Sequence, residues 1–339
     1  MMKSVEELDE ALSRPSAADI EAMAALEGDL LILGVSGKMG PSLAGLAKRA
    51  SGQSGRHRRI IGAARFSSPG SRQAVEKLGV ETAACDLLDR EALAALPDCA
   101  NVIFMTGHKF GTAENQPITW ATNTYLTCIA AERFRESRIV AFSSGNVYPL
   151  TEVASGGPDE SHPTGPVGEY AMSALGRERM LGYFSQRNRT PVTILRLNYA
   201  IDLRYGVLRD IGEKVFNRQP VPLAMGHANV IWQRDASSVA LRSFAHCSTP
   251  PFVLNLTGPE TISVREVALR FGRAFGVEPA FDGQECDTAL LSNAALCARM
   301  FGTPLVSVEQ MVEWTAAWIA QGGQSLNKPT HFEQRAGAF

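Results

Sequence analysis

Apolar runs about as long as a β-strand recur along the first half of the chain, and each is followed by a segment with helical character. The runs are continuously apolar instead of alternating with polar residues, which is typical of strands buried on both faces. We expect strands at residues 30–35, 59–64, 80–86, 101–107 and 138–144. Strands and helices in this order predict an α/β fold, a Rossmann-type doubly wound parallel sheet.

The pattern changes after residue 145. Residues 149–168 are rich in Pro, Gly and Ser and predict a loop, after which a helix at 168–186 and a strand at 191–197 are expected. The last third mixes short strands with helices, which predicts a smaller C-terminal α+β substrate domain. The expected units are a helical extension (1–28), a dinucleotide-binding domain (29–197), a mostly substrate-binding domain with some segments returning to the sheet (198–325), and a tail (326–339).

Composition and charge exclude several classes of partner. The chain has 339 residues, a formal net charge of −2 and no long basic tract, so nucleic acid is not an expected partner. It has no apolar run of the roughly 20 residues that a membrane span needs, and its acidic N-terminus does not resemble a signal peptide. Six scattered cysteines fit a reducing cytoplasm, and no cluster has metal-ligand spacing, so we expect no metal.

A glycine-rich turn follows the first expected strand and precedes a helix. Gly34, Gly37 and Gly40 permit a tight turn whose backbone N–H groups can approach a pyrophosphate at the helix N-terminus. An ordinary strand–helix turn is the alternative, but the following strand supplies the context of a dinucleotide site. The turn assigns to the cofactor site Gly34, Ser36, Gly37, Lys38, Met39 and Gly40.

The end of the second strand bears on the choice of nicotinamide cofactor. An NAD site usually has a carboxylate there, whereas residues 63–68 of this chain contain Arg65 and no acid. Arg65 can bind a 2′-phosphate through two parallel hydrogen bonds, so NADP(H) is favoured over NAD(H). Alternatively, Arg65 stacks on the adenine or points to solvent. Asp86, at the end of the third strand, is expected to hydrogen-bond the adenine.

These motifs together resemble a known family. The glycine triplet, Asp86 with Leu87, Asn123, the stretch SSGNVY, Tyr170 with Glu178, and Arg196 in LRLN are similar to the extended short-chain dehydrogenase/reductases, and more closely to the NAD-dependent epimerase/dehydratase family. The resemblance spans about residues 30–320. It implies that the cofactor site also includes Leu87, Thr106, Gly107, Asn123 and Tyr170.

The resemblance also implies a catalytic pair. Ser144 would hydrogen-bond the substrate oxygen, and Tyr170, which lies 26 residues further on (170 − 144), would be the general acid/base. The hydroxyl proton would pass to or from Tyr170 while a hydride is exchanged with the nicotinamide. The alternative for Tyr170 is a tyrosine that only packs at a helix start.

The chain departs from the family where it matters for this chemistry. The family's lysine, four residues after the tyrosine, is replaced by Ala174. A free phenol has a pKa near 10, and a nearby cation favours the phenolate. Lys109, just past the fourth strand, is our preferred replacement, and Arg177 and His108 are the other candidates. Lys109 could also be a solvated loop lysine, and Arg177 a partner of a neighbouring acid.

Candidates on the substrate side follow the later strands. Arg204 could bind a carboxylate or phosphate, whereas Trp232 could equally belong to the core. The predicted substrate-binding residues are His108, Ser144, Asn146, Arg177, Asn198, Arg204 and Trp232.

We therefore expect an NAD(P)-dependent oxidoreductase or epimerase acting on a sugar, sugar acid or nucleotide sugar. Gly145 and Asn146 stand where a dehydratase of the family carries an acid pair, so dehydration is disfavoured. The alternative is a catalytically weak NADP(H)-binding sensor, although a sensor has no need of Ser144 and Tyr170. By resemblance, a homodimer would form through the helices expected at 117–136 and 168–186.

Overall fold

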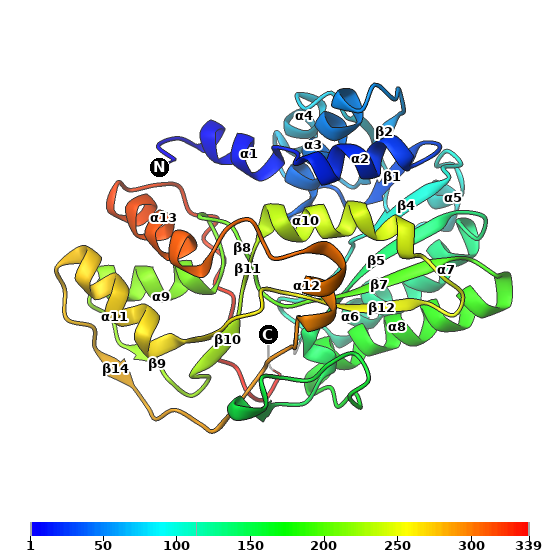
Figure 1. The fold of residues 1–339 in the computed structure, drawn as a ribbon. Helices are drawn as coiled ribbons and strands as arrows, with labels where there is room; N and C mark the ends of the chain where they lie inside the picture. The colour runs from blue at the N-terminus through cyan, green and yellow to red at the C-terminus, as the bar shows by residue number, and fades with distance from the viewer. Residues whose placement is uncertain (1, 113, 338–339) are drawn as a thin grey trace.

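The computed structural model describes residues 2–112 and 114–337. Its centre is a parallel seven-stranded sheet, as the continuous apolar runs predict (Figure 1). In spatial order the strands are β12 (Phe252–Leu256), β7 (Val192–Leu197), β5 (Arg138–Ser144), β4 (Asn101–Phe104), β1 (Leu30–Leu33), β2 (Ile60–Ala64) and β3 (Glu81–Ala84). The Rossmann-type fold class is confirmed. β1, β3 and β4 end earlier than expected because their last residues turn out of the sheet.

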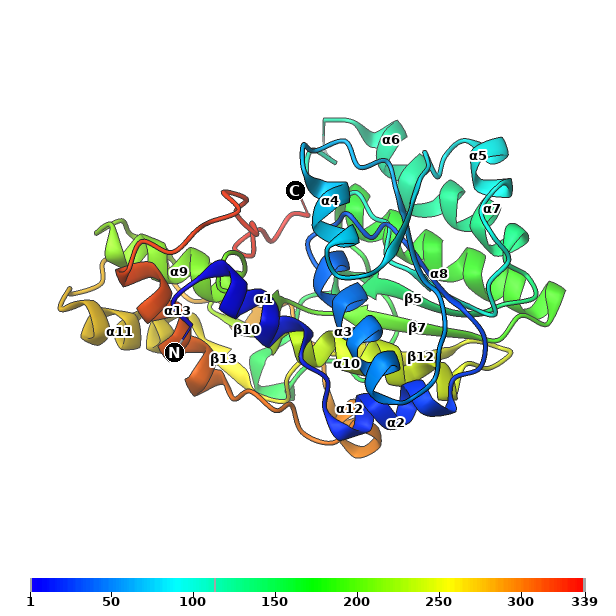
Figure 2. The ribbon, with the colours of Figure 1, turned by 90° about the horizontal axis from the view of Figure 1, so that it is seen from above.

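Helices cover both faces of the sheet (Figure 2). Alternate side chains of β1 point into two separate cores: Leu30 and Ile32 into one, and Leu31 and Leu33 into the other. The first core is closed by α3 (Gly40–Gln53), α4 (Ser71–Glu76) and α10 (Gln233–Arg242), and the second by α5 (Arg90–Ala94), α7 (Leu126–Arg133) and α8 (Gly168–Asn188). The sheet is therefore buried on both faces except at its edge strand β3, which is partly exposed.

The long helix expected around residues 117–136 is not uniform. It consists of α6 (Gln116–Trp120), a π-helical turn at Ala121–Tyr125, and α7. Such wide turns inside helices are frequent at functional sites. This one contains Asn123, whose side chain is buried.

A third core lies beyond the sheet and holds the smaller domain together. Its helices are α9 (Val207–Phe216), α11 (Val264–Phe275) and α13 (Val308–Ala320). Two-stranded pairs join β8 (Ala200–Ile201) to β11 (Ile231–Trp232), β9 (Val221–Pro222) to β14 (Phe281–Asp282), β10 (His227–Asn229) to β13 (Thr261–Ser263), and β6 (Thr151–Glu152) to β15 (Thr288–Ala289). β12, α10 and α12 (Ala295–Phe301) return to the main sheet. The domain boundaries at 28, 197 and 325 stay predictions.

The N-terminal extension forms α1 (Val5–Ser13) and α2 (Ala17–Ala25), which pack against α3 and α10. Asp19 of α2 is completely buried, and its carboxylate accepts hydrogen bonds from Arg234 and Ser238 of α10. Ser16 caps α2 and also donates to Asp19, at 2.7 Å. The extension is thus fastened to the α/β domain by a buried ion pair.

Replacing Asp19 by alanine should reduce the free energy of unfolding by about 2 kcal/mol, because Arg234 loses one of its two carboxylate partners inside the protein. Asp235 remains as the other. Urea denaturation measures the change. Glu21→Ala, an exposed position on the same helix, is the matched control and should stay within about 0.5 kcal/mol of the wild type. Equal midpoints for the two variants would contradict the role of Asp19.

The described part of the expected C-terminal tail is packed onto the protein. The Thr330 N–H and hydroxyl both donate to Asp210 Oδ2, at 2.8 and 2.5 Å. Phe332 is 1% exposed, and Arg335 donates to the carbonyls of Ala224 and Thr288. This segment covers one side of the cavity described next.

Candidate active site

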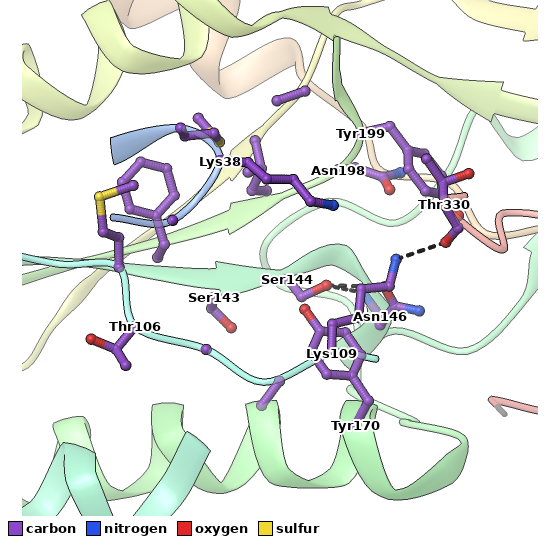
Figure 3. Close-up of a pocket in the computed structure, with 18 of the residues that line it drawn as sticks. Lys38, Thr106, Lys109, Ser143, Ser144, Asn146, Tyr170, Asn198, Tyr199 and Thr330 are labelled. Carbon is purple, nitrogen blue, oxygen red and sulfur yellow. Dashed lines mark hydrogen bonds between the residues drawn. The ribbon is translucent and has the colours of Figure 1, made fainter. Parts of the chain in front are cut away.

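A pocket of about 290 Å³ opens where the carboxyl ends of β4, β5 and β7 meet the smaller domain. Residues from the glycine-rich turn, the loop after β4, the start of α8 and the C-terminal segment line it (Figure 3). In open α/β sheets ligands bind at this edge. The pocket is therefore the candidate active site.

The glycine-rich turn is too tight for side chains at two of its glycines. Gly34 has φ +89°, and its N–H donates to Ala63 O at 2.8 Å. A Cβ atom at Gly40 would lie 1.9 Å from Val35 O. The turn leads directly into α3, so the N-terminus of this helix lies beside the pocket, which Gly37, Lys38 and Met39 line. This cradle fits the pyrophosphate of a dinucleotide.

Ser144 and Tyr170 approach the pocket from two elements. Ser144 is the last residue of β5, and its hydroxyl donates to Asn146 Oδ1 at 3.0 Å. Tyr170 lies in the first turn of α8, and Figure 3 shows its ring beneath Ser144 and beside Lys109. The structure thus brings the predicted hydroxyl pair into one cavity.

Lys109 extends from the loop after β4 into the same cavity. Its ammonium lies 5.8 Å from the ring centres of both Tyr170 and Tyr199, and 3.4 Å from Thr330 O, to which it donates. Burial lowers the pKa of Lys109 to about 8, although Asp210 and Glu333 act in the opposite direction. A cation is thus available beside Tyr170.

Asn123 holds the Lys109 loop in place from the π-helical turn. Its Oδ1 accepts from the His108 N–H at 2.8 Å, and its Nδ2 donates to His108 O at 2.9 Å. The same Nδ2 donates to Ser173 Oγ at 2.9 Å. One amide therefore fixes the loop against α8.

Arg177 also connects these segments, and its guanidinium is committed to that role. It donates to the backbone carbonyls of Thr106, Asn123 and Phe142 at 2.7, 3.2 and 2.7 Å. Burial lowers the pKa of Arg177 to about 10. Ala174, one turn earlier on α8, is 3% exposed and lines the pocket.

A buried network lies behind the pocket. Glu178 and Arg196 form an ion pair of 2.8 Å with side chains at most 7% exposed. Ser143 donates to Glu178 at 2.6 Å, and Arg196 donates to the Tyr148 hydroxyl at 2.7 Å. The network ties α8, which carries Tyr170, to β7 and to β5, which carries Ser144.

The predicted adenine end of the cofactor site lies at the ends of β2 and β3, which are neighbours in the sheet. Arg65 is exposed and comes directly after β2. Burial is the larger cause that lowers the pKa of His108, and the positive charge of Arg65 lowers it further. Asp86 is exposed, and its Oδ1 accepts from the Leu88 N–H at 3.1 Å. Leu87 is buried under this edge.

Three of the predicted substrate residues do not line the pocket: His108, in the loop after β4, and Arg204 and Trp232, whose side chains have other partners. Arg204 is ion-paired with Asp202 at 2.7 Å and with Asp9 of α1 at 2.9 Å, so it joins the extension to the smaller domain. Trp232 is 1% exposed and packs edge-on against Trp314. Neither side chain lines the pocket.

Some residues of the pocket were not predicted from the sequence, and others were assigned to a different site. Thr330 comes from a segment read only as a tail. Lys38, which the sequence assigns to the cofactor site, lies with its ammonium 3.1 Å from the ring centre of Tyr205. Tyr199 has φ +40°, a left-handed conformation that is costly for a bulky residue and clusters at functional sites.

Across residues 2–112 and 114–337, no group of three or more His, Cys, Asp or Glu side chains has the geometry of a metal site. Within these same ranges, no helix is long and apolar enough to cross a membrane.

The parallel sheet, its glycine-rich turn and the helices on both faces define a Rossmann-like α/β fold. The chain belongs to the NAD dependent epimerase/dehydratase family, whose family model matches residues 30–201. A search of curated proteins found no match.

Solved structures of similar fold come from several organisms. UDP-glucuronic acid 4-epimerase from Bacillus cereus has a TM-score of 0.70 at 15% identity, covering 86% of this chain and 99% of its own. An epimerase from Methanothermobacter thermautotrophicus has a TM-score of 0.72 at 19% identity, covering 90% of this chain and 96% of its own. A dTDP-glucose 4,6-dehydratase from Streptomyces venezuelae has a TM-score of 0.72 at 17% identity, covering 86% of this chain and 97% of its own. At these identities the likeness concerns the fold alone.

Proposed function

We propose that the protein is an NAD(P)-dependent oxidoreductase or epimerase that acts at a secondary alcohol or ketone of a carbohydrate. The observation that carries the proposal is the meeting of Ser144, Tyr170 and Lys109 in one pocket above the glycine-rich turn. The family and the nucleotide-sugar enzymes of similar fold, some of which hold NAD, support it.

A nicotinamide dinucleotide held by the glycine-rich turn would supply or accept the hydride. The Ser144 hydroxyl would hydrogen-bond the substrate oxygen at the reacting carbon. Tyr170 would take the hydroxyl proton in oxidation and return it in reduction. Burial under the C-terminal segment would keep water away from this oxygen.

Lys109 would take the role of the family's lysine, whose position in this chain is occupied by Ala174. Its ammonium is near the Tyr170 ring, and a positive charge there favours the phenolate. Arg177, the other candidate, is less suited, because its donors already serve three backbone carbonyls. We therefore assign Arg177 a positioning role.

Dehydrogenation or epimerisation fits the pocket better than dehydration. A Cβ atom at Gly145 would lie 3.0 Å from Ser292 Oγ and 3.3 Å from Asn198 Cβ, so an acidic side chain there would require these neighbours to shift. Asn146, the next residue, is not an acid. The acid pair that dehydration uses is therefore missing.

The test begins with a fluorescence titration of the purified protein with NADPH and NADH, followed by a turnover screen on sugars, sugar acids and nucleotide sugars. We expect cofactor binding and turnover of at least one carbohydrate class. Cofactor binding without turnover of any class would favour the sensor alternative. Absence of cofactor binding would contradict both.

Replacing Arg65 by alanine should raise the Kd of NADPH by about 10- to 100-fold, because a charge-assisted pair with the 2′-phosphate is lost. The Kd of NADH should change by less than about threefold, since NADH lacks that phosphate. Arg90→Ala, which removes an exposed arginine paired with Glu132 at 3.5 Å, is the control. Equal weakening of both cofactors, or of neither, would contradict an NADP(H) preference set by Arg65.

A further inference from the structure

A second cavity, of about 230 Å³, lies between the N-terminal extension and the segments of the smaller domain that return to the sheet. The helices α2, α10 and α12 meet there (Figure 2), and the loop 302–305 completes the wall. Among the described residues, none that lines this cavity also lines the candidate active site. All of the lining residues lie outside residues 30–201, the part that the family model matches. The proposed function therefore makes no use of this cavity.

The wall of the cavity is mostly apolar. Ile231, Val239 and Cys297 contribute buried side chains to it. Leu305 also lines the cavity and is 65% exposed, so the cavity meets solvent beside a large apolar side chain. Its volume far exceeds the roughly 10–15 Å³ that one water needs and lies just below the roughly 300–1,000 Å³ of typical ligand pockets. The cavity thus has room for a small molecule with an apolar body.

Three polar side chains of the wall already have partners within the protein. Arg234 donates to Asp19 and, at 3.2 Å, to Asp235. Asp235 Oδ2 also accepts from the Val306 N–H at 3.1 Å, and Ser238 donates to Asp19. These groups hold α2, α10 and the loop 302–305 together. They form the frame of the cavity and leave few of their polar atoms for a ligand.

Arg242, in the last turn of α10, has donors left for a ligand. Within residues 2–112 and 114–337, its guanidinium makes one hydrogen bond, from Nη1 to Phe301 O at 3.0 Å, and no ion pair. Its central carbon lies 5.0 Å from the ring centre of Phe301, which also lines the cavity. Burial, and then Glu160, raise the pKa of Cys297, and the charge of Arg242 acts in the opposite direction. The positive charge is therefore felt inside the cavity.

We propose that this cavity binds a small monocarboxylic acid, with its apolar body between α2, α10 and α12 and its carboxylate on Arg242. A guanidinium can bind a carboxylate through two parallel hydrogen bonds. A carboxylate fits better than a phosphate, because Asp235 also lines the cavity and would repel a doubly charged group more strongly. This second site goes beyond the proposed function and does not depend on it.

Calorimetric titration of the full chain with hexanoate, octanoate, phenylacetate and 3-phenylpropionate tests the site, and each acid is compared with its own amide. At least one acid should bind with a Kd below about 1 mM and about tenfold or more tighter than its amide, which has the same body but no charge. Arg242→Met should raise the Kd of that acid about tenfold or more and change that of the amide less than about threefold. Arg242→Lys, which keeps the charge, should recover part of the affinity. Arg299→Met, at an exposed position of α12, is the matched control.

Filling the cavity gives a test that does not depend on charge. Ala298 of α12 lines the cavity, whereas Ala295 of the same helix is exposed and does not line it. Ala298→Leu should raise the Kd of the acid about tenfold or more, and Ala295→Leu should leave it within about threefold. The acid should also raise the midpoint of thermal unfolding of the wild type but not that of Ala298→Leu, because only a protein that binds the ligand is stabilised by it.

Three results would overturn the second site and leave the proposed function standing. The first is failure of all four acids to bind at about 10 mM, a concentration at which even weak ligands are detected. The second is equal binding of the acids and their amides, which would remove the role of the carboxylate. The third is binding that neither Arg242→Met nor Ala298→Leu weakens, which would place the acids elsewhere on the protein.

Discussion

Replacing Tyr170 by phenylalanine is expected to lower kcat by about 10²- to 10⁴-fold, the usual contribution of a general acid/base. The substitution removes one oxygen and keeps the ring that lines the pocket. The Kd of NADPH should therefore stay within about threefold, and kcat and kcat/KM should fall together. Single-turnover kinetics with the best substrate from the screen measure the chemical step directly.

Tyr183→Phe is the matched control for this variant. Tyr183 lies on the same helix, α8, and is 54% exposed, so its hydroxyl should be dispensable. A Tyr170→Phe protein as active as Tyr183→Phe would remove Tyr170 from the mechanism. A variant that lost activity together with cofactor binding would instead indicate a structural role for the hydroxyl.

Lys109→Met should lower the rate of alcohol oxidation at neutral pH by about 10- to 1000-fold. The reason is that the substitution removes the positive charge that favours the phenolate form of Tyr170. The pH dependence gives a sharper test. Lysine is charged below its pKa, so the support from Lys109 is present below about pH 8 and is lost as the pH rises through that value. Lys109→Arg, whose charge persists to higher pH, should extend activity on the alkaline side.

A second variant separates charge from structure at this site. Ala174 lies on the pocket face of α8 and is buried beside Val147 and Tyr148. Introducing Ala174→Lys into the Lys109→Met protein should restore about tenfold of the lost activity if only a cation near Tyr170 is missing. Full activity of Lys109→Met alone would contradict the replacement of the family's lysine by Lys109.

The fold could be predicted because its strands are buried on both faces. Each continuous apolar run, such as Leu30–Leu33, leaves few alternatives to a covered parallel sheet. The glycine triplet was equally informative, since a Cβ atom at Gly40 would collide with the backbone of Val35. The π-helical turn was not predicted, because residues 117–136 were interpreted as one continuous helix from their overall apolar content.

The site was harder to predict, because local sequence does not fix where a long side chain ends. Arg204 and Trp232 follow strands near the pocket, yet neither side chain lines it. Arg204 is ion-paired with two aspartates, and Trp232 packs against Trp314 in the core. Lys38 crosses the pocket toward Tyr205 instead of following the turn that carries it. Thr330 reaches Lys109 from 221 positions further along the chain, a contact that only tertiary packing creates.

The π-helical turn at Ala121–Tyr125 has a consequence for insertions and deletions. A π turn contains about one residue more than an α turn, and each residue of an α-helix advances its side chains by about 100°. Deleting Ala121 or Thr122 would join α6 and α7 as a regular helix and leave the two nearly in phase, because the π turn absorbs the extra residue, but Asn123 would move back by one position and rotate by about that angle. The amide of Asn123 would then face away from His108, and the loop that carries Lys109 would lose its anchor. In this helix the number of residues matters as much as their identity.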